Sequence, residues 1–268
     1  MSKIDLKEYS FYLWTSKTAP IKYLMELLRD LLTEGNLECS SEGIKIQAVD
    51  PSRVVLIHSK LKGEKFEEYH CPETIVLGLN MEDTFKIIKN MENTDTLKLF
   101  VKKENPNKIG IETYCKEENT CDTTYLNLMD LPYEKMEIPS QTFESVISLP
   151  SNRFQKICRV IFNFSEKIEI ECEGNKLKFR GCNDNVRQET IIKPTNNGMK
   201  FLKNDNPDEI IQGFYELRHL VLFSKCSNLS NTIQIHIKNN FPLVLRCDIA
   251  NLGEIKLCLA PQVDDGNL

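Results

Sequence analysis

Lysine and arginine side chains recur at helical spacing in four separate segments of the chain. Residues three or seven apart lie on the same face of a helix, so each segment gathers its positive charges on one side. One such face alone is usually an ordinary solvated surface. Four together predict a shared positive surface that contacts phosphate groups without reading bases. The residues are Lys22 and Arg29, Lys86 and Lys89, Arg153, Lys156 and Arg159, and Arg218 and Lys225.

The sequence lacks the common motifs for catalysis. It has no glycine-rich phosphate loop, no dinucleotide-binding fingerprint and no H-E-x-x-H zinc motif. The four histidines are far apart, and none of the ten cysteines forms a C-x-x-C pair. A nuclease would need a metal-binding carboxylate cluster, whereas Glu117-Glu118 and Asp264-Asp265 lie in polar segments where solvated charge is expected. We therefore predict that the protein is not an enzyme and needs no cofactor or metal.

The overall charge limits where a nucleic acid could bind. The net charge is -5, which argues against binding through the whole surface but allows positive charge on one face. Hydrophobic residues make up 41% of the chain, enough for a packed core. No apolar run approaches the roughly 20 residues of a membrane span, and residues 1–9 do not resemble a signal peptide. We expect the scattered cysteines to be reduced and mostly buried.

Apolar periodicity predicts two helices in each half of the chain, over 20–32, 81–91, 150–162 and 214–225. Alternating apolar residues predict strands after each helix. The strands are expected at 37–39, 44–49, 53–61, 96–102, 108–114 and 123–128 in the first half, and at 168–172, 177–180, 188–193, 232–237, 243–249 and 254–259 in the second.

The same order of helices and strands therefore occurs twice, about 130 residues apart, which indicates a duplicated domain. Strands without long crossovers pair antiparallel, and helices must cover one face of the sheets. The predicted fold class is α+β, with two similar domains at 1–128 and 140–268. Residues 129–139 carry Pro132 and Pro139 and are expected to form an extended connector.

Several segments resemble the proliferating cell nuclear antigen family, whose members are DNA sliding clamps. The stretch I-Q-A-V-D-P-S-R-V at 46–54 is similar to the family signature after the first helix, and L-M-D-L at 128–131 is similar to the start of its connector. Leu149-Pro150-Ser151, with Phe154 and I-C-R at 157–159, resembles the opening of its second domain. P-L-V at 242–244, I-A at 249–250 and L-A-P at 259–261 resemble its last strands. The similarity is collinear over almost the whole chain.

The resemblance implies a ring of three identical subunits around duplex DNA, with antiparallel sheets outside and helices lining the hole. Strands near 123–128 and 188–193 would pair between subunits. Of the basic residues above, all but Arg153 match the positions that line the hole in this family. The clamp would tether DNA polymerase and other replication and repair enzymes, bind a clamp loader, and act in the nucleus or in a viral replication compartment. Two alternatives are a subunit of a heterotrimeric clamp and a monomeric viral polymerase processivity factor.

The resemblance also implies a site for partner proteins that carry a peptide with a glutamine, an aliphatic residue and two aromatic residues. Cys258 stands where many members of the family have tyrosine, and Gly174 stands where cellular eukaryotic clamps have a modified lysine. A bias toward lysine, asparagine and isoleucine suggests an AT-rich viral or protist genome. The residues of the peptide site would be Val54, Leu56, Met136, Ile138, Pro242, Cys258, Ala260 and Pro261.

Overall fold

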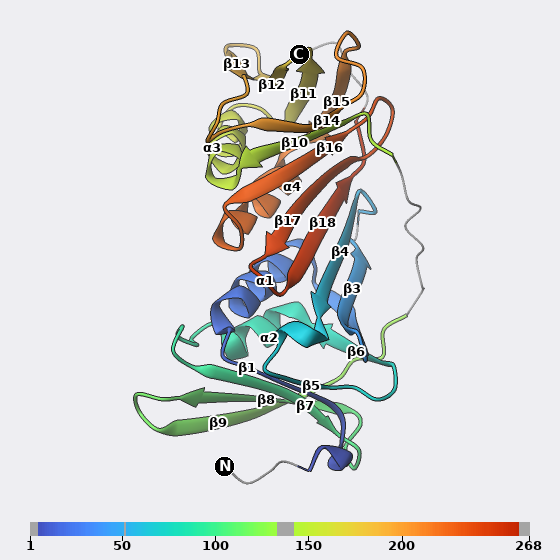
Figure 1. Ribbon diagram of the computed structural model, residues 1–268, viewed down its shortest axis with the longest axis vertical. Coiled ribbons are helices and arrows are strands. Elements are labelled where there is room, and N and C mark those ends of the chain that lie inside the picture. The colour runs from blue at the N-terminus through green and yellow to red at the C-terminus, as the bar shows by residue number, and fades with distance from the viewer. Residues whose placement is uncertain (1–4, 51, 133–141, 263–268) are drawn as a thin grey trace. The chain divides into compact units, whose positions relative to one another are not determined.

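The computed structural model describes residues 5–50, 52–132 and 142–262 (Figure 1). The chain forms two compact units. The first unit comprises Met1–Ala48, His58–Met136 and Ile249–Glu254, and the second comprises Val49–Ile57, Glu137–Asp248 and Ile255–Leu268. Each unit therefore takes most of its residues from one half of the sequence and a short segment from the other. The predicted domain boundaries at 128 and 140 stay a prediction.

The first unit has two sets of antiparallel strands and two α-helices. One sheet has the strand order β5-β1-β7-β8-β9, and in the other set β2 pairs with both β3 and β6. The elements of the first half of the sequence are β1(Tyr9–Thr15), α1(Thr18–Leu31), β2(Glu34–Ser40), β3(Gly43–Val49), β4(Val55–Lys62), β5(Glu68–His70), β6(Ile75–Asn80), α2(Met81–Ile88), β7(Thr96–Lys102), β8(Lys108–Cys115) and β9(Thr120–Asn127).

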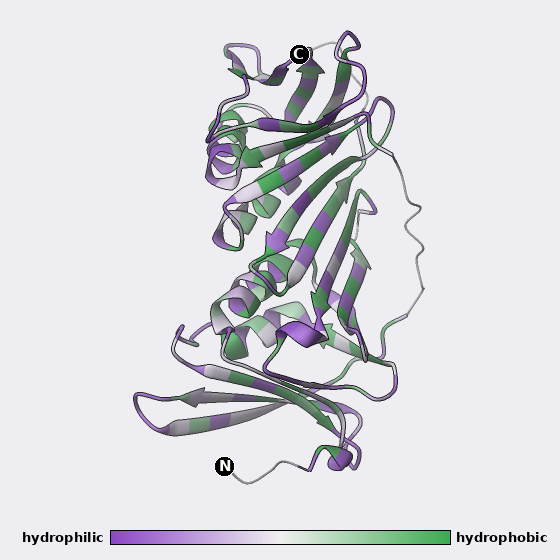
Figure 2. Cartoon of the chain, viewed as in Figure 1, coloured by the Kyte–Doolittle hydropathy of each residue, from purple (hydrophilic) through white to green (hydrophobic). Residues whose placement is uncertain are grey.

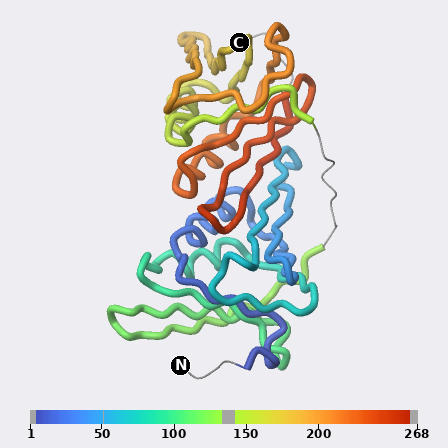
Figure 3. Tube along the Cα trace, viewed as in Figure 1, coloured from blue at the N-terminus to red at the C-terminus, as the bar shows by residue number. Residues whose placement is uncertain are grey.

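The second unit is built in the same way. One sheet has the order β13-β12-β11-β15, and the neighbouring strands β14-β10-β16-β17-β18 form another row. Figure 3 follows the chain through both units by colour. The elements of the second half of the sequence are β10(Ser145–Pro150), α3(Ser151–Phe162), β11(Lys167–Glu173), β12(Lys176–Cys182), β13(Arg187–Ile192), β14(Lys200–Asn204), β15(Ile211–Glu216), α4(Leu217–Phe223), β16(Thr232–Ile237), β17(Leu243–Ile249) and β18(Gly253–Leu259).

The predicted duplication is confirmed by the strand pairing. The pairs β1–β7, β1–β5 and β7–β8 of the first unit correspond to β10–β16, β10–β14 and β16–β17 of the second. Likewise β2–β3 and β2–β6 correspond to β11–β12 and β11–β15. In this scheme β4 is the equivalent of β13, and β9 is the equivalent of β18.

Both long helices bury one apolar face, as their periodicity predicts. On α1, Leu24, Leu27 and Leu28 are at most 1% exposed, and on α3 Phe154 and Cys158 are fully buried. Along the strands, hydrophobic and hydrophilic residues alternate, as Figure 2 shows. Burial of each leucine side chain stabilises the fold by about 1.5–3 kcal/mol, so these faces fix the helices to their sheets.

Two helix predictions need correction. The helix predicted at 214–225 is wrong at its start, because Phe214 belongs to β15, in which alternate residues are buried and paired with β11. Helix α4 begins at Leu217, and its end continues as a 3-10 helix over Ser224–Asn228. On α2, Ile88 is buried, but Phe85 and Ile87, expected in the core, are only half-buried.

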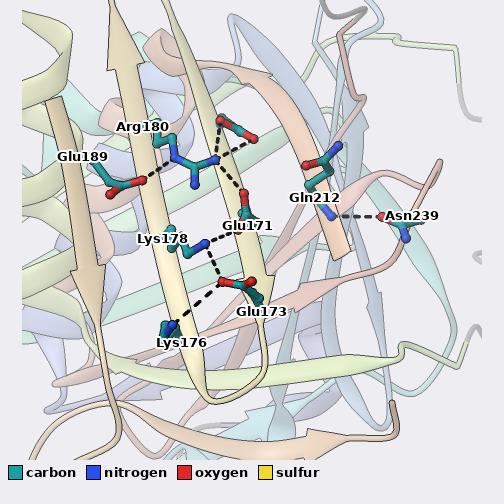
Figure 4. Close-up of polar contacts among 9 residues, drawn as sticks. Glu171, Glu173, Lys176, Lys178, Arg180, Glu189, Gln212 and Asn239 are labelled. Atoms are coloured by element: carbon teal, nitrogen blue, oxygen red, sulfur yellow. Dashed lines mark hydrogen bonds and ion pairs between the residues drawn. The ribbon is translucent and has the colours of Figure 1, made fainter. Parts of the chain in front are cut away.

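Edge strand β13 is held by a network of ion pairs on one face of its sheet (Figure 4). The Arg180 guanidinium lies 3.1 Å from Glu169 and 2.6 Å from Glu171, both on β11, and 2.5 Å from Glu189 on β13. Lys178 lies 2.6 Å from both Glu171 and Glu173. Side chains from three adjacent strands are therefore joined, and we refer to these residues as the Arg180 network.

Candidate functional site

The basic residues of the first unit are largely paired within that unit. Lys22 donates from Nζ to the carbonyl of Met91 at 2.6 Å. Arg29 lies 2.7 Å from Asp30 and 3.8 Å from Glu82, and its guanidinium stacks 4.3 Å from the centroid of the Phe85 ring. A hydrogen bond to Asp30 raises the pKa of Arg29 further above its ordinary value.

The same holds for Lys86 on α2, which lies 3.7 Å from Glu82 and 3.3 Å from Asp83. Of the four basic residues predicted in this unit, Lys89, at the end of α2, is exposed and has no ion-pair partner among the described residues. The helices of this unit thus carry cations whose charge is mostly balanced by neighbouring carboxylates.

Helix α3 of the second unit differs, because its cations are free. Arg153, Lys156 and Arg159 are all exposed, and none has an ion-pair partner among residues 5–50, 52–132 and 142–262. The α3 sequence, S-N-R-F-Q-K-I-C-R-V-I-F, contains no acidic residue. This helix therefore presents the strongest positive surface of the predicted set and is the best candidate for contact with phosphates.

The cations that follow in α4 are less available. Arg218 lies 2.6 Å from Glu216, and Lys225 is half-buried in the 3-10 helix after α4. Burial lowers the pKa of the adjacent His219, which is 7% exposed, so this imidazole is neutral at neutral pH and adds no positive charge.

Six of the eight residues predicted to bind a partner peptide lie in the second unit, while Met136 and Ile138 lie outside the described residues. The backbone N–H of Ala260 donates to the carbonyl of Val54 at 3.0 Å, so the chain just after β18 lies beside the start of β4. In an antiparallel pair this register sets Leu56 opposite Cys258. These four side chains are half-buried, as is Pro242, and Pro261 is exposed.

Cys258 is the member of this group that departs most from the family pattern. Burial raises the pKa of its thiol, so the side chain is protonated at neutral pH and behaves as a small apolar group. The half-buried residues Val54, Leu56, Cys258 and Ala260 thus form a continuous apolar strip along two adjacent strands.

A cavity of about 690 Å³ in the second unit includes Pro261, a predicted site residue. Ile210, Phe214 and Phe241 supply its apolar lining, and none of them was predicted from the sequence. The backbone N–H of Gln262 donates to the carbonyl of Phe214 at 2.7 Å, which joins the end of the described chain to β15. No motif or spacing in the sequence marked these residues, although Ile210 is 48% exposed in the structure.

A turn built on Asp50 positions Val54 at this site. One carboxylate oxygen of Asp50 accepts hydrogen bonds from the backbone N–H groups of Val54 at 2.9 Å and Val55 at 2.7 Å, and the other accepts from Ser52. Burial alone would raise the pKa of Asp50, but these hydrogen bonds outweigh burial and lower it. Arg53 adopts a left-handed φ of 58°, so the turn is strained there.

We expect Asp50→Ala to lower the free energy of unfolding by about 2–3 kcal/mol, because buried N–H donors lose their acceptor. The pKa of Asp50 is lower in the folded state than in the unfolded state, where it is about 3.9. The stabilisation that ionised Asp50 gives to the folded state should therefore be complete above about pH 3.9. It should disappear as the pH falls through the lower pKa that Asp50 has in the folded state. Urea unfolding of both proteins across this range measures the difference. Asp184→Ala, at an exposed loop carboxylate, is the control, and an equal loss in both variants would contradict the role of the turn.

No group of three or more His, Cys, Asp or Glu side chains within 5–50, 52–132 and 142–262 is arranged to hold a metal ion. Over the same residues, no helix is both long and apolar enough to cross a membrane.

Comparison with known proteins matches both halves of the chain to the same family. Residues 13–135 match the family model for "Proliferating cell nuclear antigen, N-terminal domain", and residues 137–262 match that for the C-terminal domain. The "Probable DNA polymerase sliding clamp 1" of Paramecium bursaria Chlorella virus 1 is 29% identical over 255 residues, covering 94% of this chain and 96% of the viral protein. The proliferating cell nuclear antigen of Chaetomium thermophilum is 29% identical over 251 residues, covering 91% and 95%.

A solved structure agrees with these matches. The crystal structure of the proliferating cell nuclear antigen from Entamoeba histolytica superposes with a TM-score of 0.87 at 25% identity, covering 95% of this chain and all of the other. The duplicated fold and these matches define a DNA sliding clamp, a processivity factor for DNA polymerase. The chain belongs to the proliferating cell nuclear antigen family.

Proposed function

We propose that three identical copies of this chain close into a ring around duplex DNA and hold DNA polymerase on it without catalysing a reaction. The observation that carries the proposal is a pair of sheet edges, one in each unit, each with a neighbouring strand on one side only among residues 5–50, 52–132 and 142–262. Strand β9 ends the sheet of the first unit, and β13 ends the sheet of the second.

Both edge strands run antiparallel to their single neighbours, β9 to β8 and β13 to β12. Their outer N–H and C=O groups face no other strand of the described residues, so β9 of one copy would pair with β13 of the next and remove both edges. Such head-to-tail contacts generate a ring when the rotation closes.

In this ring Lys156 and Arg159 of α3 would meet the phosphates, together with Lys22, Arg29, Lys86, Lys89, Arg218 and Lys225. The chain's net charge of -5 supports a loose fit, since topological retention needs few strong phosphate contacts. The apolar strip of Val54, Leu56, Cys258 and Ala260 would bind the peptide of polymerase, clamp loader or other replication proteins. The protein would act in the nucleus or in a viral replication compartment.

Light scattering and DNA retention test the ring directly. We expect a mass three times that of the 31.0 kDa chain at micromolar concentration. Protein threaded onto linear DNA should remain bound in high salt when both DNA ends are blocked by a bound protein, and should be lost when the ends are free. Salt screens phosphate contacts but does not open a closed ring. A single-chain mass, or equal loss from blocked and free DNA, would refute the proposal.

A further inference from the structure

The first unit contains an acidic cavity of about 360 Å³ between the end of α2 and strands β8 and β9. Apolar side chains from α2 and β8, such as Ile87 and Ile111, form part of its wall. None of its carboxylates has an ion-pair partner in the described part of the chain. These carboxylates are Glu92, Asp95, Glu117, Glu118 and Asp122.

Asp95 places a carboxylate oxygen without a hydrogen-bond donor at this cavity. Its side chain lines the cavity and the residue is only 6% exposed. Oδ2 accepts a hydrogen bond from the backbone N–H of Glu92 at 2.8 Å, whereas Oδ1 is buried without a partner. A buried carboxylate oxygen without a donor is costly, so an added donor that reaches it is strongly favoured.

The position of the cavity connects it to the proposed subunit contact. Alternate residues of edge strand β9, namely Thr120, Asp122 and Thr124, line it on the face that also carries α2. A neighbouring copy that paired with β9 would therefore bring the helix-bearing face of its own edge strand, β13, next to this cavity.

On the second unit, α3 is the helix closest to β13. Its Ile161 side chain packs against Gly181 on β12, the strand next to β13. Gln155, on one flank of α3, donates to the carbonyl of Ser224 just after α4, and α4 follows β15 at the opposite end of the sheet. Arg153 and the exposed Val160 lie on the other flank, by helical spacing, and thus face the β13 edge.

We propose that Arg153 of one copy enters the acidic cavity of the next copy and that this ion pairing sets the head-to-tail order of the ring. The inference rests on the proposed ring. A guanidinium can donate to several carboxylates at once, and the partly buried cavity strengthens each contact. Contacts between two acidic cavities, or between two α3 helices, would bring like charges together and are disfavoured.

The test is the dissociation of the trimer, measured by sedimentation equilibrium with folding checked by circular dichroism. We expect Arg153→Glu to raise the dissociation constant of the subunit contact at least tenfold. Lys200→Glu makes the same change of charge at an exposed cation of the second unit on β14, and we expect it to assemble like the parent. Adding Glu117→Lys and Glu118→Lys to Arg153→Glu should restore assembly.

The outcomes separate this inference from the ring itself. If the parent assembles and Arg153→Glu assembles equally well, or if the lysine substitutions do not rescue a defect, the cavity does not receive Arg153. If Lys200→Glu dissociates as much as Arg153→Glu, the effect is one of overall charge and the inference is wrong. A monomeric parent would instead overturn the proposed ring.

Discussion

The double variant Lys156→Glu with Arg159→Glu is expected to lose most of its stimulation of DNA polymerase on primed circular DNA while remaining a trimer. Both side chains are exposed on the acid-free helix α3, so reversal replaces two free cations by two anions at the phosphate surface. Each lost phosphate contact removes about one unit from the slope of log affinity against log salt concentration, so the slope should fall by about 2. Stimulation assays and DNA binding at several salt concentrations measure both effects.

Lys86→Glu with Lys22→Glu is the matched comparison, because it makes the same change of charge at two cations that already have partners in the first unit. We expect a smaller reduction in the salt slope from this pair. An α3 variant that stimulates polymerase as well as the parent would show that α3 does not face DNA. Equal losses from the two double variants would contradict the inference that the unpaired cations of α3 contribute more to DNA binding than Lys22 and Lys86 do.

Ala260→Leu is expected to weaken binding of a glutamine-aliphatic-diaromatic peptide at least tenfold, or by about 1.4 kcal/mol. Ala260 is half-buried and its backbone is hydrogen-bonded to Val54, so a larger side chain would fill the apolar strip from one side. A few apolar anchors usually dominate such affinities, and blocking their pocket removes most of that contribution. Isothermal titration calorimetry with the parent and the variant measures the change.

Asn251→Leu provides the control, because it adds a leucine at an exposed turn residue assigned to the other unit. The variant should bind the peptide like the parent. If Ala260→Leu retains full affinity, or if the parent binds no such peptide, the partner site lies elsewhere. A loss in both variants would indicate a general effect of added apolar surface.

Helical periodicity predicted α1 and α3 well, because their buried leucines and aromatic residues recur on one face. It failed where burial did not alternate. Strand β1 has three consecutive residues, Phe11, Tyr12 and Leu13, that are each 1% exposed, so it shows no two-residue pattern and was not predicted. At 214–225 the pattern merged a strand, a short helix and a 3-10 turn into one helix, since all three bury apolar residues.

For the candidate sites, the sequence predicted which residues could take part but not how their side chains are arranged. Spacing identified the basic residues, but it could not show that Arg29 and Lys86 are balanced by Asp30, Glu82 and Asp83, because ion pairing depends on side-chain positions in the folded unit. The resemblance supplied Val54 and Ala260, which the structure brings together, but not Ile210 or Phe241, which line the adjacent cavity. Met136 and Ile138 remain predictions.

The Arg180 network has a consequence for how fast and how reversibly copies of the chain can join. A strand that became ordered only on contact with its partner would lose roughly 1–2 kcal/mol of backbone conformational entropy per residue. Strand β13 has six residues, and Arg180 already fixes its Glu189 to β12 and β11 within a single chain. The edge is thus a rigid template before assembly. In the proposed ring, the subunit contact would then open and close as a unit, without unfolding of β13, each time the ring is placed on DNA or removed from it.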